Sequence, residues 1–262
     1  MIRLLLTKFK NILVLLIIFA MTTTCSFAQP NKTTTEDYIK VTVIEDTVDT
    51  MAIQNRQCEV IIRAGEYQGK AGKRIYINNS TVNLPDDILI RNDNDGKGFY
   101  VSEWDINVKE AKALVSKLQA LGVNAKLQVA TTKAEDLNAA GRIANKSNPY
   151  LYVSVHHNYY ASDSTGYFSM YNPNNQMSKQ VAARLSDALK DNGQVPQRSH
   201  RENTGYIGEL NAINSSTTPV LLELGFFSNI DELEKICSNS YVDYVSTNLA
   251  NEISNILNEN YK

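Results

Sequence analysis

The chain has 262 residues, of which 43% are hydrophobic and 21% are charged, and its formal net charge at pH 7 is −2. This length is enough for one sizeable hydrophobic core, or for a core with an additional arm. The slightly acidic balance argues against a nucleic-acid partner, because such a partner normally requires a clustered basic face.

Residues 1–28 have the pattern of a secretory signal peptide. Basic residues precede an unbroken apolar run over residues 12–21, and Ser26 and Ala28 are the small residues of a cleavage site. The run is too short to span a bilayer, so an uncleaved membrane anchor is the weaker alternative. The threonines before Cys25 do not match a lipoprotein signal. We therefore expect a secreted protein with no membrane contact after cleavage.

The expected mature chain begins at Gln29. The signal peptide holds three basic residues and no acidic ones, so 23 basic and 28 acidic residues remain, a net charge of −5. Residues 29–57 are polar and rich in threonine, which predicts a leader or arm with at most one added strand. Residues 58–262 alternate between strand and helix patterns and predict a single α/β domain.

The first predicted strand of this domain is Val60–Ile62, and an irregular insertion follows it over residues 66–102. Within the insertion, Asp93, Asp95 and Gly96 resemble part of a calcium-binding loop. The glutamate that such a loop needs is missing, so a solvated turn is favoured.

A long helix is predicted after Ser102, which has the position of an N-cap with Asp105 at N3, and Gly122 has the position of a C′ glycine. Further strands are predicted at 125–129, 150–155 and 220–224, and further helices at 134–145, 175–190 and around 245–256. Strands separated by helices predict a mostly parallel twisted sheet flanked by helices on both faces.

Polar side chains follow two of the predicted strands at the point where each strand ends. His156 and Asn158 follow one strand, and Glu223 follows another. Ligands bind at the carboxyl ends of strands in such sheets, so these positions favour an active site. His157 should point to the face opposite His156. A lone strand-end histidine is otherwise more often structural, whereas a carboxylate after a buried strand is costly without a partner or a role.

Several segments together resemble the zinc-dependent N-acetylmuramoyl-L-alanine amidases of the type 3 family, which cut the bond between glycan and peptide in bacterial cell walls. Ser154–Asn158 is similar to the family's Ser-Ile-His-Ala-Asn segment, and Glu223–Phe226 to its Glu-Leu-Gly-Phe segment. Glu103 lies where the family has a helical zinc ligand, and Gly141–Asn145 resembles a helix end of the family. The resemblance runs from Cys58 to about Tyr261, in the expected order.

The resemblance implies a Zn²⁺ site with Glu103 and His156 among its ligands and Glu223 as the catalytic acid–base. It departs from the family at Glu66, which stands where the first histidine ligand is expected, and at Arg63, which replaces an aspartate. Glutamate is an acceptable zinc ligand, so Glu66 completes the expected set, although two anionic ligands weaken the Lewis acidity of the metal. The alternatives are a surface turn for Glu66 and a helix-dipole role for Glu103.

Asn158 and His200 are the expected substrate-binding residues. His200 lies in a polar loop, and its other interpretations are a solvated loop histidine or a replacement metal ligand. Cys58 and Cys237 remain after signal cleavage, and the sequence leaves open whether they pair or are buried as small hydrophobic residues.

The favoured function is a secreted, cell-wall-associated zinc amidase acting on peptidoglycan. Two alternatives stay open. One is a catalytically inactive relative that binds cell-wall peptides or another wall enzyme, suggested by Glu66. The other is a hydrolase with a different substrate, such as a zinc carboxypeptidase acting on free peptides. The sequence identifies no particular protein partner.

Overall fold

The computed structural model describes residues 58–69, 74–78, 81–93, 96–190, 193–199, 201–202 and 207–259. The expected signal peptide, the leader at 29–57 and His200 lie outside the described residues, so their proposed roles stay predictions. Among the described residues, no helix combines the length and the apolar character that crossing a membrane requires.

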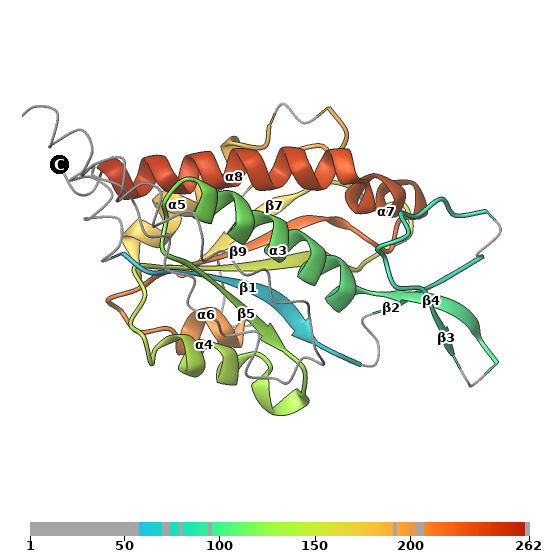
Figure 1. The fold of residues 1–262 in the computed structure, drawn as a ribbon, viewed down its shortest axis with the longest axis horizontal. Coiled ribbons are helices and arrows are strands. Elements are labelled where there is room, and N and C mark those ends of the chain that lie inside the picture. Colours follow the sequence, from blue (N-terminus) through green and yellow to red (C-terminus); the bar gives the residue numbers. More distant parts are fainter. Residues whose placement is uncertain are drawn as a thin grey trace, which may run out of the picture. The chain divides into compact units, whose positions relative to one another are not determined.

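A six-stranded sheet forms the centre of the described fold, in the order β5-β1-β6-β9-β7-β8 (Figure 1). Its strands are β1 (Val60–Tyr67), β5 (Ala125–Ala130), β6 (Leu151–Asn158), β7 (Phe168–Tyr171), β8 (Arg201–Glu202) and β9 (Thr218–Phe226). The first four strands in the sheet order are parallel to one another, β7 is antiparallel to β9, and β8 is parallel to β7. The mostly parallel α/β fold is confirmed.

Helices cover both faces of this sheet (Figure 1). One face carries α3 (Glu103–Ala120), α5 (Gln176–Asp187) and α8 (Asn239–Glu259), and the opposite face carries α4 (Asn138–Ala144) and α6 (Gly208–Ala212). The short helix α7 (Ile230–Cys237) leads into α8. The large hydrophobic core lies under α3, α5 and α8, and a small cluster of Ile61, Ala144, Tyr152 and Ile213 lies on the α4 and α6 side.

Strand alternation decides which side chains meet which helices. On β1, Val60 and Ile62 join the large core, whereas Ile61 and Arg63 point toward α4 and α6. Tyr152 of β6 also lies on that second face. His156 follows Tyr152 by four residues, so it projects from the same face.

The capping residues predicted for α3 are confirmed. The Ser102 side chain accepts a hydrogen bond from the backbone N–H of Asp105, and Gly122 ends the helix with a φ of 78°. Capping of this kind satisfies donors that the first turn would otherwise leave unpaired. It fixes where α3 begins, and therefore where Glu103 lies.

Part of the insertion between β1 and α3 forms regular structure, where the prediction was an irregular segment. It contains a separate antiparallel sheet of β2 (Arg74–Ile77), β4 (Gly98–Ser102) and β3 (Arg91–Asp93), in that order. The carbonyl of Asp93 accepts a hydrogen bond from the N–H of the exposed turn residue Gly96, in keeping with the predicted turn, and Asp95 lies outside the described residues. The side chain of Asp93 is buried, however, where it pairs with Arg74 and accepts a hydrogen bond from the hydroxyl of Tyr76.

Other elements differ from the prediction in their bounds. The helix expected at 134–145 is a 3₁₀ turn (Lys133–Glu135) followed by α4, with Leu137 at a φ of 43° between them. The strands β7 and β8 and the helices α6 and α7 were not predicted.

The sequence left open whether the two cysteines pair. Cys58 and Cys237 are both buried and are not joined by a disulfide.

Candidate metal centre

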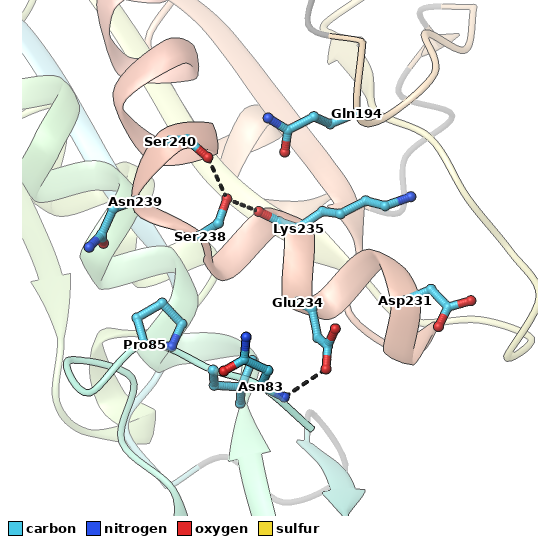
Figure 2. A pocket seen from close by; sticks show the side chains of 10 residues that line it. Asn83, Pro85, Gln194, Asp231, Glu234, Lys235, Ser238, Asn239 and Ser240 are labelled. Atoms are coloured by element: carbon cyan, nitrogen blue, oxygen red, sulfur yellow. Dashed lines mark hydrogen bonds between the residues drawn. The ribbon is translucent and has the colours of Figure 1, made fainter. Parts of the chain in front are cut away.

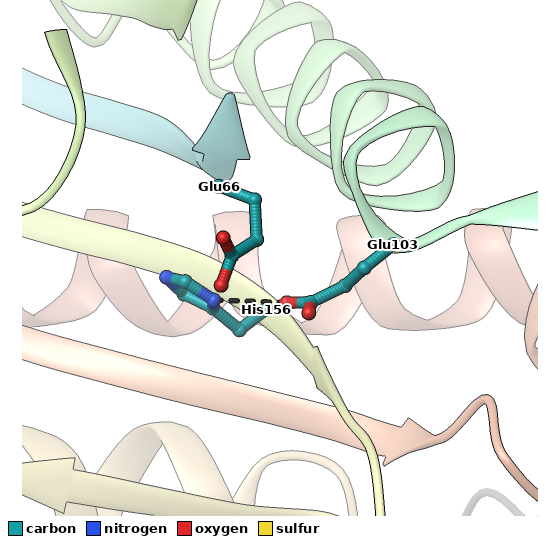
Figure 3. A group of neighbouring side chains, drawn as sticks. All are labelled: Glu66, Glu103 and His156. Carbon is teal, nitrogen blue, oxygen red and sulfur yellow. Dashed lines mark hydrogen bonds and ion pairs between the residues drawn. The ribbon is translucent and has the colours of Figure 1, made fainter. Parts of the chain in front are cut away.

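Three side chains expected to bind a metal converge at the carboxyl edge of the sheet. Glu66 comes from the end of β1, Glu103 from the first residue of α3 and His156 from β6 (Figure 3). One ligand atom from each lies within 4.8 Å of the others, and the three residues are 3%, 0% and 5% exposed. The interpretation of Glu66 as a surface turn residue is therefore wrong.

A backbone irregularity directs Glu66 into the site. The pairing of β1 with β5 shifts register between Ala64 and Tyr67, and Glu66 has a φ of 64°. A residue other than glycine in this left-handed region is uncommon and costs roughly 1–2 kcal/mol. Strain of this kind is concentrated where it holds a side chain in a particular direction.

Glu103 is held by a neighbour on its own helix. Asn107 lies one turn later, and its amide donates hydrogen bonds to Glu103 Oε1 at 3.2 Å and to the carbonyl of Gly65 at 3.1 Å. Asn107 thus joins the start of α3 to the end of β1. Full burial of the Glu103 carboxyl group means that the helix dipole alone does not account for its position.

The imidazole of His156 lies between two carboxyl groups. Its Nδ1 is 3.0 Å from Glu103 Oε1, and its Nε2 is 3.0 Å from Glu209 Oε1. Burial alone lowers the pKa of His156, but the hydrogen bonds that its ring N–H groups donate to Glu103 and Glu209 outweigh this effect and raise the pKa to about 10. The metal-free arrangement is therefore a charged imidazolium between two carboxylates.

Glu209, on α6, belongs to a buried charged network that the sequence did not indicate. Its Oε2 forms an ion pair with Arg63 Nε at 3.3 Å and accepts a hydrogen bond from the Tyr152 hydroxyl at 3.2 Å. Burial alone raises the pKa of Glu209. The charges and hydrogen bonds of Arg63 and His156 have the larger, opposite effect, and the pKa is lowered from 4.5 to about 2. Arg63, also fully buried, hydrogen-bonds the carbonyls of Ala64 and Glu66.

The neighbouring histidine has a structural role. His157 points to the α3 face, where its Nδ1 lies 2.9 Å from Asn107 Oδ1. Burial lowers the pKa of His157 to about 3, so the ring is neutral at physiological pH. The two adjacent histidines therefore have different partners, as strand alternation predicts.

Glu223 lies on β9 in direct register with His156 of β6. Register partners in a parallel sheet project from the same face, about 4.7–4.9 Å apart along the hydrogen-bonding direction. Glu223 is half-buried. Asn158 ends β6 next to Phe226, and its carbonyl accepts a hydrogen bond from the N–H of Phe227.

The donor set fits Zn²⁺. Two carboxylates and one imidazole are ligand types that zinc accepts, and together the two anionic groups match the charge of a divalent cation. Ligand atoms that share a tetrahedral zinc lie about 3.3 Å apart for bond lengths of about 2.0–2.1 Å. The 3.0 Å separation of His156 Nδ1 and Glu103 Oε1 is close to that value.

A cavity of about 760 Å³ lies apart from this cluster (Figure 2). It is lined by Asn83–Pro85 of the insertion, by residues of α7 and by the start of α8, and no predicted site residue lines it. Glu234 of α7 closes one side by accepting a hydrogen bond from the backbone N–H of Asn83 at 2.6 Å.

Two carboxylates and an imidazole lie together at the carboxyl edge of a parallel sheet. Side chains of these types at this place are suited to metal-assisted hydrolysis. The family model of N-acetylmuramoyl-L-alanine amidases matches residues 92–255, more than half of the chain, and the chain belongs to this family. Glu103, His156 and Glu223 lie inside the matched residues, whereas Glu66 lies before them. No curated protein matches the chain.

Solved structures of amidases share the fold. The N-acetylmuramoyl-L-alanine amidase from Clostridium difficile 630 has a TM-score of 0.59 at 20% identity, over 77% of this chain and 97% of that one. The catalytic domain of CwlV from Bacillus (Paenibacillus) polymyxa var. colistinus has a TM-score of 0.58 at 20% identity, over 76% and 98%. The CwlD amidase from Clostridioides difficile, solved in complex with the GerS lipoprotein, has a TM-score of 0.57 at 20% identity, over 76% and 98%.

Proposed function

We propose that the protein is a secreted, zinc-dependent amidase that hydrolyses the amide between N-acetylmuramic acid and L-alanine of peptidoglycan. The observation that carries the proposal is the convergence of Glu66, Glu103 and His156, with Glu223 in register beside His156. Membership of the amidase family supports the substrate class. The signal-peptide pattern of residues 1–28 supports secretion to the cell wall.

In this proposal Glu66, Glu103 and His156 hold the zinc. Zinc bound at such a site acidifies a water molecule and polarises a carbonyl group. The Glu223 carboxylate takes a proton from the attacking water and delivers it to the nitrogen of the departing L-alanine as the C–N bond breaks. Asn158 and His200 are proposed to orient the substrate.

A second candidate is a catalytically inactive relative that binds cell-wall peptides or another wall enzyme. The favouring observation is that His156 is already hydrogen-bonded by carboxyl groups at both ring nitrogens, which makes a charge-paired network without a metal. The complex of the CwlD amidase with a lipoprotein gives a precedent for a protein partner of this fold.

Metal analysis and wall digestion of the full-length protein separate the two candidates. The amidase predicts close to one zinc per chain and release of stem peptides from purified sacculi, with mass spectrometry showing a free L-alanine amine. Glu223→Ala should reduce release by roughly 10²–10⁴-fold, the usual contribution of a general base. Zinc content should stay unchanged, because Glu223 is outside the ligand cluster.

A wild-type protein that holds no zinc at micromolar metal and releases no peptide from sacculi is a binder, and the amidase proposal then fails. Cleavage of small free peptides instead of sacculi would keep the hydrolase but change its substrate class.

A further inference from the structure

The two ring nitrogens of His156 have different surroundings. Nδ1 faces Glu103, and in Figure 3 the carboxyl group of Glu66 also lies on this side of the ring. Nε2 faces away from that pair and lies 3.0 Å from Glu209 Oε1. The ring therefore has one side directed at the candidate ligands and another directed at α6.

The chemistry of Glu209 decides which nitrogen is available to a metal. An ionised carboxylate only accepts hydrogen bonds, so Nε2 must carry the hydrogen between them. A histidine must lose one hydrogen of the imidazolium to bind a metal, and the resulting neutral ring has a hydrogen on one nitrogen and a lone pair on the other. The lone pair is then on Nδ1, toward Glu66 and Glu103.

Glu209 is itself held in place from two directions. Tyr152, on the same face of β6 as His156, donates its hydroxyl hydrogen bond to Oε2, and Arg63 pairs with the same oxygen. All three side chains are fully buried. A buried ion pair contributes little net stability, since desolvation offsets its attraction. The network is therefore better explained by its action on His156 than by stabilisation of the fold.

Gly65 fixes the plane of the ring. A Cβ atom at this position would lie only 2.3–2.5 Å from Cε1, Nε2 and Cδ2 of His156. The imidazole thus packs directly on the backbone of β1, and any side chain here would displace it. Arg63 reinforces the contact through its hydrogen bonds to the carbonyls of Ala64 and Glu66, on either side of Gly65.

We propose that Glu209 is the positioning residue of the candidate metal centre, accepting the Nε2–H hydrogen bond of His156 and thereby presenting Nδ1 to the metal. The inference rests on the zinc site of the proposed function. Carboxylate partners of this kind fix the tautomer and orientation of a ligating histidine, and their loss typically costs 10–100-fold in metal affinity.

The test compares two carboxylates that both pair with Arg63. Glu209→Gln removes the charge next to His156, whereas Asp136→Asn removes another acidic partner of Arg63, at 3.4 Å, without altering a His156 contact. Zinc affinity of the full-length protein is measured by competition with a chromophoric chelator. We expect Glu209→Gln to bind zinc about 10–100-fold more weakly, and Asp136→Asn to bind close to wild type.

The deciding result of a second measurement comes from the wild type alone and does not depend on the variants folding. Two-bond ¹H–¹⁵N correlation spectra of ¹⁵N-histidine-labelled wild type, recorded with bound zinc, distinguish metallated Nδ1 from metallated Nε2. The proposal expects metallated Nδ1 with a hydrogen on Nε2, and loss of this single state in Glu209→Gln. Metallated Nε2 in the wild type overturns it.

The outcomes separate the positioning role from the function. Zinc bound by the wild type with unchanged affinity in Glu209→Gln overturns the positioning role and leaves the amidase standing. A wild type that binds no zinc overturns both. An equal loss in Asp136→Asn overturns the specific role of Glu209, because the effect then belongs to Arg63 packing.

Discussion

Glu66 combines three properties that rarely occur together in one side chain: it is buried, it is acidic, and its backbone is left-handed. Each property has a cost, and each is explained if the carboxylate binds a cation. In the proposed metal centre, Glu66 supplies the second anionic ligand beside Glu103. The two anionic ligands neutralise the charge of a divalent ion, which reduces the positive charge that acts on a substrate carbonyl.

Replacing Glu66 by histidine tests this role. Histidine is among the residues that tolerate the left-handed region, so the bulge in β1 should persist. Imidazole is a preferred zinc ligand, and we expect Glu66→His to tighten zinc binding by roughly tenfold, or about 1.4 kcal/mol. Glu66→Gln, which keeps the length but removes the charge, should weaken binding. Equal zinc affinity in all three proteins would place Glu66 outside the metal's ligands.

The sequence could indicate part of this site and not the rest. His156, Glu103 and Glu223 follow recognisable patterns: a strand end, a capped helix start and a carboxylate after a buried strand. Glu209 has no such pattern, because it lies in a five-residue helix without periodicity. Its importance comes from Arg63 and His156, which are distant in sequence and meet it only in the folded sheet.

At the scale of elements, α3 is the helix that joins the site to the core. This helix packs on α8, and its first turn carries Glu103. Its middle contains a second buried acid, Glu110, whose carboxyl oxygens have no hydrogen-bond partner among the described residues. Burial raises the pKa of Glu110 well above its usual 4.5. Burial of this group therefore lowers the stability of the folded protein, and Glu110 is not among the candidate metal ligands.

We predict that Glu110→Met increases the free energy of unfolding at pH 8 by about 1–3 kcal/mol, since a buried polar group without partners is lost. The folded state binds the proton of Glu110 more tightly than the unfolded state does. The contribution of Glu110 to the free energy of unfolding is therefore fully present below pH 4.5. Above pH 4.5 it falls by up to about 1.4 kcal/mol per pH unit, until the pH exceeds the raised pKa of Glu110 in the folded state.

Urea unfolding between pH 5 and pH 8 measures this slope. Glu110→Gln is the matched control, because it keeps the buried polar atoms and removes the titration. Both variants should lose the contribution of Glu110 to the slope, and only Glu110→Met should also gain stability. A wild-type slope that neither variant changes would contradict the burial of this acid.

Long amphipathic elements were predictable from periodicity, and short ones were not. The apolar residues of α3, α5 and α8 recur at helical spacing on the side that is buried, as with Ala111, Val115 and Leu118 of α3. The small sheet of β2, β3 and β4 has strands of three to five residues, too short for a clear alternation. Its pairing depends on contacts between segments, such as that of Asp93 with Arg74.

At the scale of the whole molecule, the reactivity of two buried cysteines measures how accessible the core is to solvent and reagents. Cys58 precedes β1 and Cys237 ends α7, and both are buried without a disulfide. Burial raises the pKa of the Cys237 thiol to about 12. Only the thiolate reacts readily, so the folded protein should protect this residue even in an oxidising environment.

We expect alkylation of Cys237 by iodoacetamide at pH 8 to be at least about 100-fold slower in the folded protein than in urea. Cys58 should also be protected by its burial. Mass spectrometry of the two cysteine peptides measures both rates. Rapid labelling of either peptide without urea would show that the described core opens under native conditions.

The junction between the two sheets has a mechanical consequence. Strand β4 ends at Ser102 and α3 begins at Glu103, with no intervening residue, and Arg91 of β3 pairs with Asp105 in the first turn of the helix. The small sheet of β2, β3 and β4 is therefore joined directly, through the backbone and through this ion pair, to the helix turn that carries the Glu103 carboxylate. A molecule bound to the outer strands β2 and β3 would therefore contact a segment that continues into Glu103, without occupying the candidate metal centre itself.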